Sequence, residues 1–340
     1  MQTIRNLFIL FILLGAGALY YLSEPAEEQQ SSLGADRNFA VENVEDIGKI
    51  FIADRKGNRT LLERKGEQWI FNDTYPAKPN AVDNLLDAVR RVQVKFKPPQ
   101  AAEEHIVKSL ASEGIKVEIY DRSGTLIKAY YVGGATSDER GTYMILENAN
   151  QPYVAHIPSW EGNIRFRYNL KDDAWRDETI LAYTPEEIES ISIEYPKQRN
   201  KSFILERDGN DFTVRPFFEL TPKINRPLSQ GLIEGYLMNY EAIMAEGFEN
   251  KNPGKDSIRA QVPFSIITVN DTKGKSKTIK LFPIYIDRSG VDPKTGLVVN
   301  TEFPVERYFI DASNGDFFLT QHRLLSKLLW AYEFFYEQPS

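Results

Sequence analysis

The sequence predicts an α+β fold of two tandem repeats, each an antiparallel β-sheet (meander plus hairpins) with helices packed on one face, after an N-terminal transmembrane helix. Three observations predict it. The stretch LLERKGEQW (61–69) recurs as ILERDGNDF (204–212). The elements around both copies follow in the same order, and the offset between matched positions grows steadily along the chain, as in a duplicated fold. A chance likeness between two β-meanders is the alternative explanation.

Composition limits the class of protein. A chain of 340 residues, 42% hydrophobic and 12% aromatic, suits two folded units. The net charge of -7 argues against a nucleic-acid partner, which needs a clustered Lys/Arg surface. Cysteine is absent, which excludes disulfides, thiolate metal sites and a Cys nucleophile.

The N-terminal stretch LFILFILLGAGALYYL (7–22) follows Arg5 and precedes acidic residues. This charge order predicts a single-pass inner-membrane protein with a cytoplasmic N-terminus and a periplasmic bulk. At about 1.5 Å per residue the helix spans roughly 24 Å, less than a ~30 Å hydrocarbon core. A cleaved signal peptide, with Ala16 to Ala18 as its cleavage site, and a buried core helix are the alternatives. Residues 1–22 are therefore anchor or signal sequence, and the acidic, polar residues 23–38 a flexible tether.

The first repeat is expected over residues 39–180. The run KIFIADRKGNRTLLERKGEQWIF (49–71) has short β-prone segments broken at two turns, which predicts a three-stranded meander. Two helices should follow, over 80–92 with Asn80 as N-cap and over 101–114 with Gly114 as the stop. Hairpins are then expected around Ser123-Gly124 and around 148–151.

The second repeat, residues 181–340, is expected to replay this order with a meander, a helix, a hairpin and a closing pair of strands. It begins near a helix start at Thr184, with Pro185 in the first helical position. At the end, TQHRLLSKLLWAYEFFYEQPS (320–340) predicts a helix packing on this repeat. An interfacial membrane or partner helix is the alternative for this aromatic segment.

Several of these stretches together resemble a known family. IGKIFIADRKGNRTLLERKGEQWIFNDTYPAKPNAVDNLLDAVRRVQV, IKVEIYDRSGTLIKAYYVGG, GTYM and AWRDETILAYTPEEIESISIEY are similar to the domain of unknown function 4340 family, in its membrane-anchored form from Bacteroidota. The resemblance is good over residues 39–200 and looser beyond. It implies an envelope protein without established enzymology, whose relatives include partners of gliding-motility ABC-type transporters. It lends no functional residues.

Catalytic and metal-binding signatures are missing from the sequence. The three histidines, His105, His156 and His322, have no H-E-x-x-H spacing. No serine lies in G-x-S-x-G or S-x-x-K. Asp287, Gly290 and Asp292 miss the calcium-loop pattern of an EF-hand. We therefore expect no catalytic residues, no metal and no cofactor.

Two loops are the candidate recognition sites. GGATSDERGTY (133–143) and YIDRSGVDPKTG (285–296) occupy equivalent places in the two repeats and mix Asp, Arg and Gly between strands. The candidate ligand- or partner-binding residues are Asp138, Arg140, Tyr143, Asp287 and Arg288. Ordinary hairpin connections with solvated charges are the alternative. Trp69, Trp160 and Trp175 are expected in core or inter-unit packing rather than as sugar platforms.

These patterns favour a membrane-anchored, non-enzymatic envelope protein that binds or scaffolds another envelope protein, such as a transporter. The alternative from another class is a cell-wall glycan hydrolase whose carboxylates converge only in the fold. A secreted soluble binding module, produced by cleavage after Ala18, is a third hypothesis. The sequence leaves the ligand and the oligomeric state open.

Overall fold

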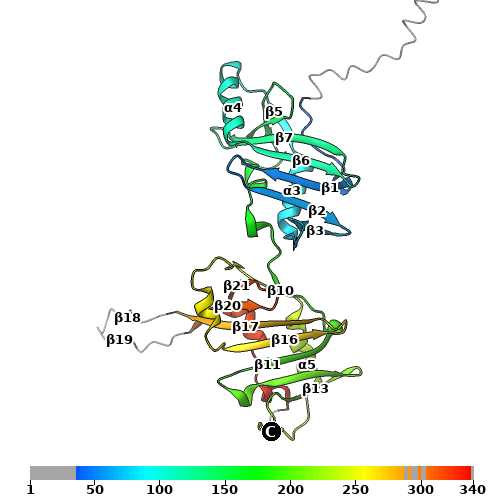
Figure 1. Cartoon of the computed structure of the whole chain (residues 1–340), viewed down its shortest axis with the longest axis vertical. Helices are drawn as coiled ribbons and strands as arrows, with labels where there is room; N and C mark the ends of the chain where they lie inside the picture. Colours follow the sequence, from blue (N-terminus) through cyan, green and yellow to red (C-terminus); the bar gives the residue numbers. More distant parts are fainter. Residues whose placement is uncertain (1–35, 287–289, 292–297, 300–303, 338–340) are drawn as a thin grey trace, which may run out of the picture. The chain divides into compact units, whose positions relative to one another are not determined.

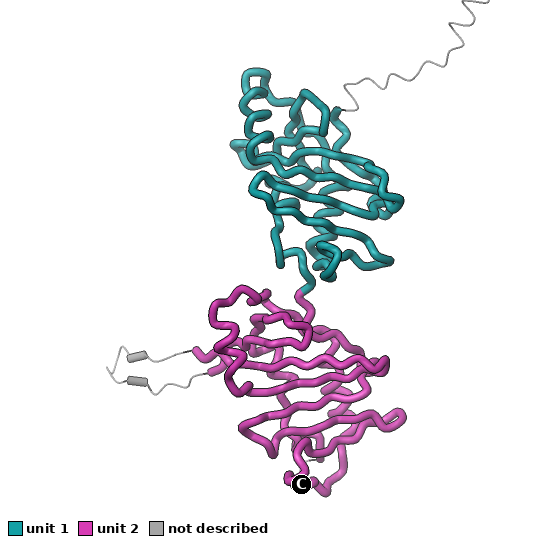
Figure 2. The backbone as a smooth tube through the Cα atoms, in the orientation of Figure 1, with its two compact units in different colours: residues 1–177 teal, residues 178–340 magenta. Residues whose placement is uncertain are grey.

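A computed structural model describes residues 36–286, 290–291, 298–299 and 304–337. The chain divides into two compact units, up to Asp177 (unit 1) and from Glu178 (unit 2) (Figure 2). Each unit has its own hydrophobic core, and each core lies against one large antiparallel sheet (Figure 1).

Unit 1 contains a nine-stranded sheet in the order β4-β3-β2-β1-β6-β7-β8-β9-β5. Its strands are β1 Ile47–Ala53, β2 Arg59–Lys65, β3 Gln68–Phe71, β4 Tyr75–Pro76, β5 Gln93–Phe96, β6 Ile115–Asp121, β7 Leu126–Ala135, β8 Thr142–Leu146 and β9 Tyr153–His156. Its helices are α3 Pro79–Arg91 and α4 Gln100–Glu113, and its 3-10 turns are η1 Val44–Asp46, η2 Arg165–Arg167 and η3 Asp172–Trp175. The predicted first meander is confirmed as β1 to β3.

Unit 2 contains an eight-stranded sheet in the order β13-β12-β11-β16-β17-β20-β21-β15. Its strands are β11 Ile188–Glu194, β12 Phe203–Asp208, β13 Asp211–Pro216, β15 Gly247–Phe248, β16 Ser265–Asp271, β17 Ser276–Tyr285, β20 Val305–Ala312 and β21 Phe317–Gln321. Two small pairs are β10 Thr179–Leu181 with β14 Ile243–Met244, and β18 Gly290–Val291 with β19 Val298–Val299. The remaining elements are α5 Gln230–Leu237, α6 Lys255–Arg259, α7 His322–Leu325 and the 3-10 turns η4 Pro185–Glu187, η5 Arg199–Lys201, η6 Met238–Tyr240, η7 Ser326–Leu328 and η8 Tyr332–Phe335.

The two large sheets have the same strand order. Apart from β4, the sequence β3-β2-β1-β6-β7-β8-β9-β5 in unit 1 corresponds to β13-β12-β11-β16-β17-β20-β21-β15 in unit 2. The registers agree as well, because Lys49 faces Glu63 as Ser190 faces Glu206. Both first strands have a bulge at their start, next to Ile47 and Ile188. The structure therefore pairs positions of the two units one by one.

Each unit is closed by the same arrangement of its last residues. The backbone N–H of Lys78, just before α3, donates to the carbonyl of Trp175 over 2.8 Å. The backbone N–H of Ser229, just before α5, donates to the carbonyl of Phe335 over 3.0 Å. Trp175 and Phe335 are both fully buried. The last turn of each unit thus buries one large aromatic residue and binds the backbone at the start of α3 or α5.

The predicted fold class is wrong. Most of the described chain outside loops is antiparallel sheet, and in the described part of unit 2 no α-helix exceeds eight residues. The helices of unit 1 also do not share one face. Helix α3 buries Leu85 and Val89 in the core with Val117, whereas Leu110 of α4 packs on Gly133, which points to the opposite face of β7 from Val132. The predicted cap is wrong too, because Pro79 is the first helical residue and Lys78 precedes it.

The predicted helix over residues 320–340 is also wrong. The described part of the segment forms α7, η7 and η8, with an interruption from Leu329 to Ala331. At the interruption, two backbone carbonyls accept hydrogen bonds from buried tyrosines instead of from a helix. The Tyr236 hydroxyl donates to the carbonyl of Leu328, and the Tyr195 hydroxyl donates to the carbonyl of Trp330. Because Phe335 is buried in the core of unit 2, the aromatic segment does not present an interfacial helix.

The predicted transmembrane helix (7–22) and the tether up to residue 35 lie outside the described residues. Within the ranges that the structure describes, no helix is long and apolar enough to cross a membrane. The prediction of a single-pass inner-membrane protein with a periplasmic bulk is therefore corrected, because no described helix supplies the span on which it rests.

Candidate basic site on unit 1

The repeated motif that marks the duplication has a structural role. Its arginine lies over the aromatic residue that ends the motif, with Arg64 Cζ 5.1 Å from the Trp69 ring and Arg207 Cζ 4.6 Å from the Phe212 ring. The same guanidinium fixes the turn that precedes the first strand. Arg64 pairs with Glu45 in η1 over 2.7 Å, and Arg207 donates to the backbone carbonyls of Pro185 and Ile188 around η4. Residues shared by the two units therefore maintain the fold.

Positions that differ between the units are the better candidates for function, because the same framework forms without them. One such difference surrounds an open hollow of about 400 Å³ on unit 1. It lies across the start of β1, between the β2–β3 turn and the β6–β7 turn. Its lining residues are Gly48, Lys49, Glu63, Arg64, Lys65, Gly66, Asp121, Arg122, Ser123 and Gly124.

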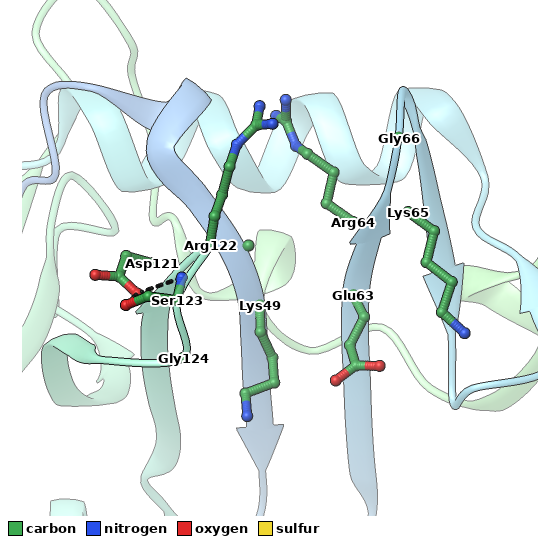
Figure 3. A pocket seen from close by; sticks show the side chains of 10 residues that line it. Lys49, Glu63, Arg64, Lys65, Gly66, Asp121, Arg122, Ser123 and Gly124 are labelled. Carbon is green, nitrogen blue, oxygen red and sulfur yellow. Dashed lines mark hydrogen bonds between the residues drawn. The ribbon is translucent and has the colours of Figure 1, made fainter.

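Glycine at position 48 allows the strands to approach at the bulge of β1. A Cβ atom there would lie 2.7 Å from both Arg122 Cα and the carbonyl oxygen of Asp121. The close approach brings the β6–β7 turn, with Arg122, alongside β1 and β2. Figure 3 shows the guanidinium groups of Arg64 and Arg122 pointing toward one another, with Lys49, Glu63 and Lys65 lying along the strands.

Cationic side chains dominate this hollow. Lys49, Arg64, Lys65 and Arg122 contribute four positive charges, against two carboxylates from Glu63 and Asp121. Asp121 is occupied locally, since its Oδ1 accepts the backbone N–H groups of Ser123 and Thr125, both over 2.8 Å. A hydrogen bond from the Ser123 hydroxyl, with these backbone bonds, lowers the pKa of Asp121. Asp121 therefore stays ionised, and with Glu63 it offsets two of the four positive charges of the lining.

One carboxylate already shows how this site holds an oxyanion. Glu45 projects from η1, its side chain is 73% exposed, and it accepts a hydrogen bond from Arg64. That hydrogen bond and the charge of Arg64 lower the pKa of Glu45, and the charge of Arg122 adds to the effect. The backbone carbonyl of the same residue accepts Arg122 Nε over 3.0 Å. Arg64 thus contacts the exposed Glu45 carboxylate, and Arg122 contacts the backbone carbonyl of the same residue.

The corresponding surface of unit 2 has the opposite charge. The register pairs the lining positions with Glu189, Ser190, Glu206, Arg207, Asp208, Gly209, Asp271, Thr272, Lys273 and Gly274. These residues contribute two cations and four carboxylates. Lys49 and Arg122, which have Ser190 and Thr272 as counterparts, are thus specific to unit 1.

The candidate residues of the first predicted loop stay apart from this hollow. Asp138 accepts hydrogen bonds within its own turn, from the Thr136 hydroxyl (2.5 Å) and the backbone N–H of Arg140 (3.2 Å). Tyr143 lies in β8 opposite Val154. Asp287 and Arg288 lie outside the described residues. The proposal of these five residues as a binding site stays a prediction, and no described contact brings Asp138, Arg140 and Tyr143 together around a cavity.

Trp160 does not follow the expectation for the tryptophans. Trp175 is fully buried and Trp69 is partly buried against the core, but the Trp160 side chain is 42% exposed. The three histidines lie on three separate elements, and His322 Nδ1 is 3.3 Å from the Tyr308 hydroxyl. Among the described residues, no group of His, Cys, Asp and Glu could hold a metal ion.

A pair of carboxylates on the outer face of unit 1 bears on the hydrolase hypothesis. Glu118 and Glu147 both contact Lys116 Nζ, over 2.7 and 2.9 Å. Burial alone would raise the pKa of Glu118, but hydrogen bonds from Lys116 and Tyr120 outweigh it and lower the pKa. A general acid for glycoside hydrolysis needs a raised pKa. This pair is therefore an ion-pair network and gives the hydrolase hypothesis no support.

The fold and site together define a duplicated antiparallel β-sheet protein with one basic face. Residues 69–257 match the family described as Domain of unknown function (DUF4340), more than half of the chain. The chain belongs to this family, and the match crosses the boundary between the two units. The membrane-anchored form and a source in Bacteroidota are not part of what the match shows. No significant similarity to a curated protein or a solved structure was found.

Proposed function

We propose that this protein is a non-enzymatic binding protein whose unit 1 anchors an oxyanion of its partner, a carboxylate or a phosphate, in the basic hollow. The observation that carries the proposal is the reversal of charge between matched surfaces of a duplicated fold. Four cations and two carboxylates line the hollow in unit 1, whereas the equivalent positions of unit 2 hold two cations and four carboxylates.

Physical chemistry favours arginine and lysine in this role. Guanidinium groups offer paired N–H donors that match a carboxylate or a phosphate, and charge-assisted hydrogen bonds are roughly twice as strong as neutral ones. On a chain with a net charge of -7, a concentrated positive area also attracts and orients an acidic partner during encounter. In this proposal the matched surface of unit 2, with its opposite charge, does not bind the acidic partner.

The test uses the full chain, with a hexaglutamate peptide and inorganic phosphate as probes in calorimetric titrations. A double variant, Lys49→Ser with Arg122→Thr, places the unit 2 residues in unit 1. Its control, Ser190→Glu with Thr272→Glu, adds two negative charges at the matched positions of unit 2 and so lowers the net charge of the chain by the same amount. We expect the first variant to bind at least about tenfold more weakly than the wild type, and the control to bind within about twofold.

The two probes separate the two oxyanions. Binding of hexaglutamate alone identifies a carboxylate site, and binding of phosphate alone identifies a phosphate site. Absence of binding to either probe, or equal weakening in both double variants, would refute the proposal. A transporter component as partner, which the family resemblance implies, is tested by crosslinked capture with the same two variants.

A further inference from the structure

A second surface of unit 1 also lacks a counterpart in unit 2. In unit 1, residues 157–164 connect β9 to η2, whereas in unit 2 helix α7 begins directly after β21. The inserted segment carries Trp160, which is 42% exposed, next to Phe166, which is 50% exposed. Their ring centroids are 6.1 Å apart. Two adjacent exposed aromatic rings, one on the inserted segment and one in η2, are unusual for a surface that contacts only water.

The guanidinium of Arg167 contacts both aromatic rings. Its Cζ atom is 5.0 Å from the centroid of the Trp160 ring and 5.8 Å from that of Phe166. The side chain is itself buried, and its Nη1 donates to Asp87 over 2.7 Å and to the carbonyl of Asn84 over 3.1 Å. Its Nε has no hydrogen-bond partner among the described residues. The guanidinium of Arg167, which is bound to Asp87 and Asn84 of α3, therefore links the two rings to this helix.

Three guanidiniums share one carboxylate at this end of α3. Asp87 contacts Arg167 over 2.7 Å, Arg91 over 3.3 Å and Arg90 over 3.7 Å. Burial alone would raise the pKa of Asp87, but hydrogen bonds from Arg167 and Arg91 outweigh it, so the pKa is lowered and the carboxylate stays ionised. Asp83, one turn earlier in α3, and Glu161 on the inserted loop are further carboxylates in these segments. The three guanidiniums at Asp87 outnumber the one carboxylate that they share.

Helix stability explains only part of this cluster. Arginines in the last turn of a helix interact favourably with its dipole, which accounts for Arg90 and Arg91. It does not account for an exposed tryptophan. When α3 and α5 are aligned on their buried positions, Val82 with Ile233 and Leu85 with Tyr236, the counterparts of Asp87, Arg90 and Arg91 are Met238, Glu241 and Ala242. The fold therefore forms in unit 2 without an aspartate and two arginines at these three positions.

We propose that Trp160, Phe166 and the exposed arginines of α3 form a docking site, separate from the basic hollow, for an acidic polypeptide segment with an aromatic residue between carboxylates. Trp and Arg are enriched among residues that carry most of the free energy of protein binding. The rings receive the apolar side chain, and Arg90 and Arg91, whose side chains are 54% and 43% exposed, receive the flanking carboxylates. A nucleic acid is disfavoured, because it needs a continuous basic track.

The experiment measures binding of the synthetic peptide Glu-Asp-Phe-Asp-Glu, with blocked ends, to the full chain. A second peptide has Ala in place of Phe, and a third has Lys and Arg in place of the acids. We expect the wild type to prefer the first peptide at least about fivefold over the second and not to bind the third. Equal binding of the first two peptides would overturn the proposal.

Variants locate the binding. Trp160→Ala with Phe166→Ala, and separately Arg90→Ala with Arg91→Ala, should each weaken the first peptide about tenfold or more. The control for the arginine variant is Met238→Glu with Ala242→Glu, at the counterparts of Asp87 and Arg91 in unit 2; it changes the net charge equally and should bind like the wild type. Hydrogen exchange of α3 verifies that the variants stay folded. Wild-type affinity in the aromatic variant would overturn the proposal.

One further variant separates this inference from the proposed function. Lys49→Ser with Arg122→Thr removes cations of the basic hollow and should leave binding of the aromatic peptide unchanged. Should that variant lose the peptide while the aromatic variant retains it, the peptide binds in the hollow, and the docking site proposed here is wrong although the proposed function stands. Stronger binding of a single-stranded oligonucleotide of the same charge would also overturn it.

Discussion

The two units share one framework and differ most on the outer faces of their sheets. On unit 1 this face is charged and aromatic, with Lys49 4.3 Å from the centre of the Tyr120 ring and Lys116 bridging two glutamates. On unit 2 the counterparts of Lys49, Lys116, Glu118 and Tyr120 are uncharged: Ser190, Ile266, Thr268 and Asn270. Ser190 bonds to Asn270 and Thr268 to Thr278, both over 2.9 Å. The comparison teaches that the core fixes the strand order, whereas the outer face is free to acquire a function.

The residues that agree are those that the fold requires. Asp121 and Asp271 both accept two backbone N–H groups of their hairpin turns. Arg64 and Arg207 both lie over the last aromatic residue of the repeated motif. Unit 2 therefore shows which residues of unit 1 the fold requires. Substitutions at matched positions of the two units test this comparison.

The largest effect is expected from the two closing aromatics. Trp175→Ala and Phe335→Ala each empty a fully buried site, and such truncations cost about 3 to 5 kcal/mol. Each substitution should destabilise its own unit and leave the other unchanged. Hydrogen exchange read by mass spectrometry, peptide by peptide on the full chain, measures both at once. Equal loss of protection in the two units after either substitution would contradict the view of two separate cores.

The second prediction concerns the loss of stability when either arginine of the repeated motif is replaced. Arg207→Ala leaves the carbonyls of Pro185 and Ile188 without their donors, which should cost about 2 kcal/mol. Arg64→Ala removes a pair with an exposed carboxylate and a contact with Trp69, together about 1 kcal/mol. Urea unfolding of the two variants gives the difference. A larger loss in Arg64→Ala would mean that Glu45 and Trp69 support unit 1 more than their exposure indicates.

The third effect depends on pH. Asp54 accepts the backbone N–H groups of Lys56 and Asn58 and lies 3.3 Å from Lys171. Burial opposes ionisation, but these donors and the Asn58 side chain outweigh it and lower the pKa of Asp54 to about 2 from 3.8. Because the folded pKa is lower, this stabilisation is complete above about pH 4 and is lost as the pH falls toward 2. At the matched turn of unit 2, the acceptor is the Ser202 hydroxyl, which accepts the backbone N–H of Tyr195. A serine hydroxyl does not titrate in this pH range.

We therefore expect acid to weaken unit 1 through this turn. Between pH 5 and pH 3 the wild type should lose up to about 1 kcal/mol more than Asp54→Asn, after allowance for solvent screening. Urea unfolding followed by tryptophan fluorescence measures this in a Trp330→Phe background, where Trp69, Trp160 and Trp175 report on unit 1 alone. An identical pH dependence with and without Asp54 would show that the turn is maintained without its charge.

Local patterns in the sequence predicted the strands better than the helices. The alternation of apolar residues and the turn residues Gly57, Gly66 and Gly124 identified the hairpins that the structure contains. The segment from Leu324 to Phe335 has helical spacing, but its conformation is set by distant partners. Tyr236 and Tyr195, which are remote in the sequence, hold the carbonyls that a helix would have used. A sequence pattern does not contain such tertiary hydrogen bonds.

The basic hollow was missed for a related reason. Lys49, Arg64 and Arg122 come from three separate parts of the chain, and only the pairing of β1 with β2 and β6 brings them together. The signal that could have found them was present in the repeat itself. Writing LLERKGEQW beneath ILERDGNDF places Lys65 opposite Asp208, a reversal of charge inside a motif that is otherwise matched. The two loops were predicted as recognition sites because they combine turn residues with charges. An ordinary hairpin turn needs the same combination.

The smallest expected change in stability tests most directly whether a residue that differs between the two units has a binding role. Lys49→Ser and Ser190→Lys exchange one matched pair across the two units. Lys49→Ser removes the contact with the Tyr120 ring, worth about 0.5 to 1 kcal/mol at an exposed site, and Ser190→Lys should change stability by less than about 0.5 kcal/mol. Urea unfolding measures both. If Lys49→Ser costs more than about 1.5 kcal/mol, the lysine is part of the framework, and its absence from unit 2 no longer indicates a binding role. A small cost, combined with weakened hexaglutamate or phosphate binding, would assign the lysine to recognition rather than to the fold.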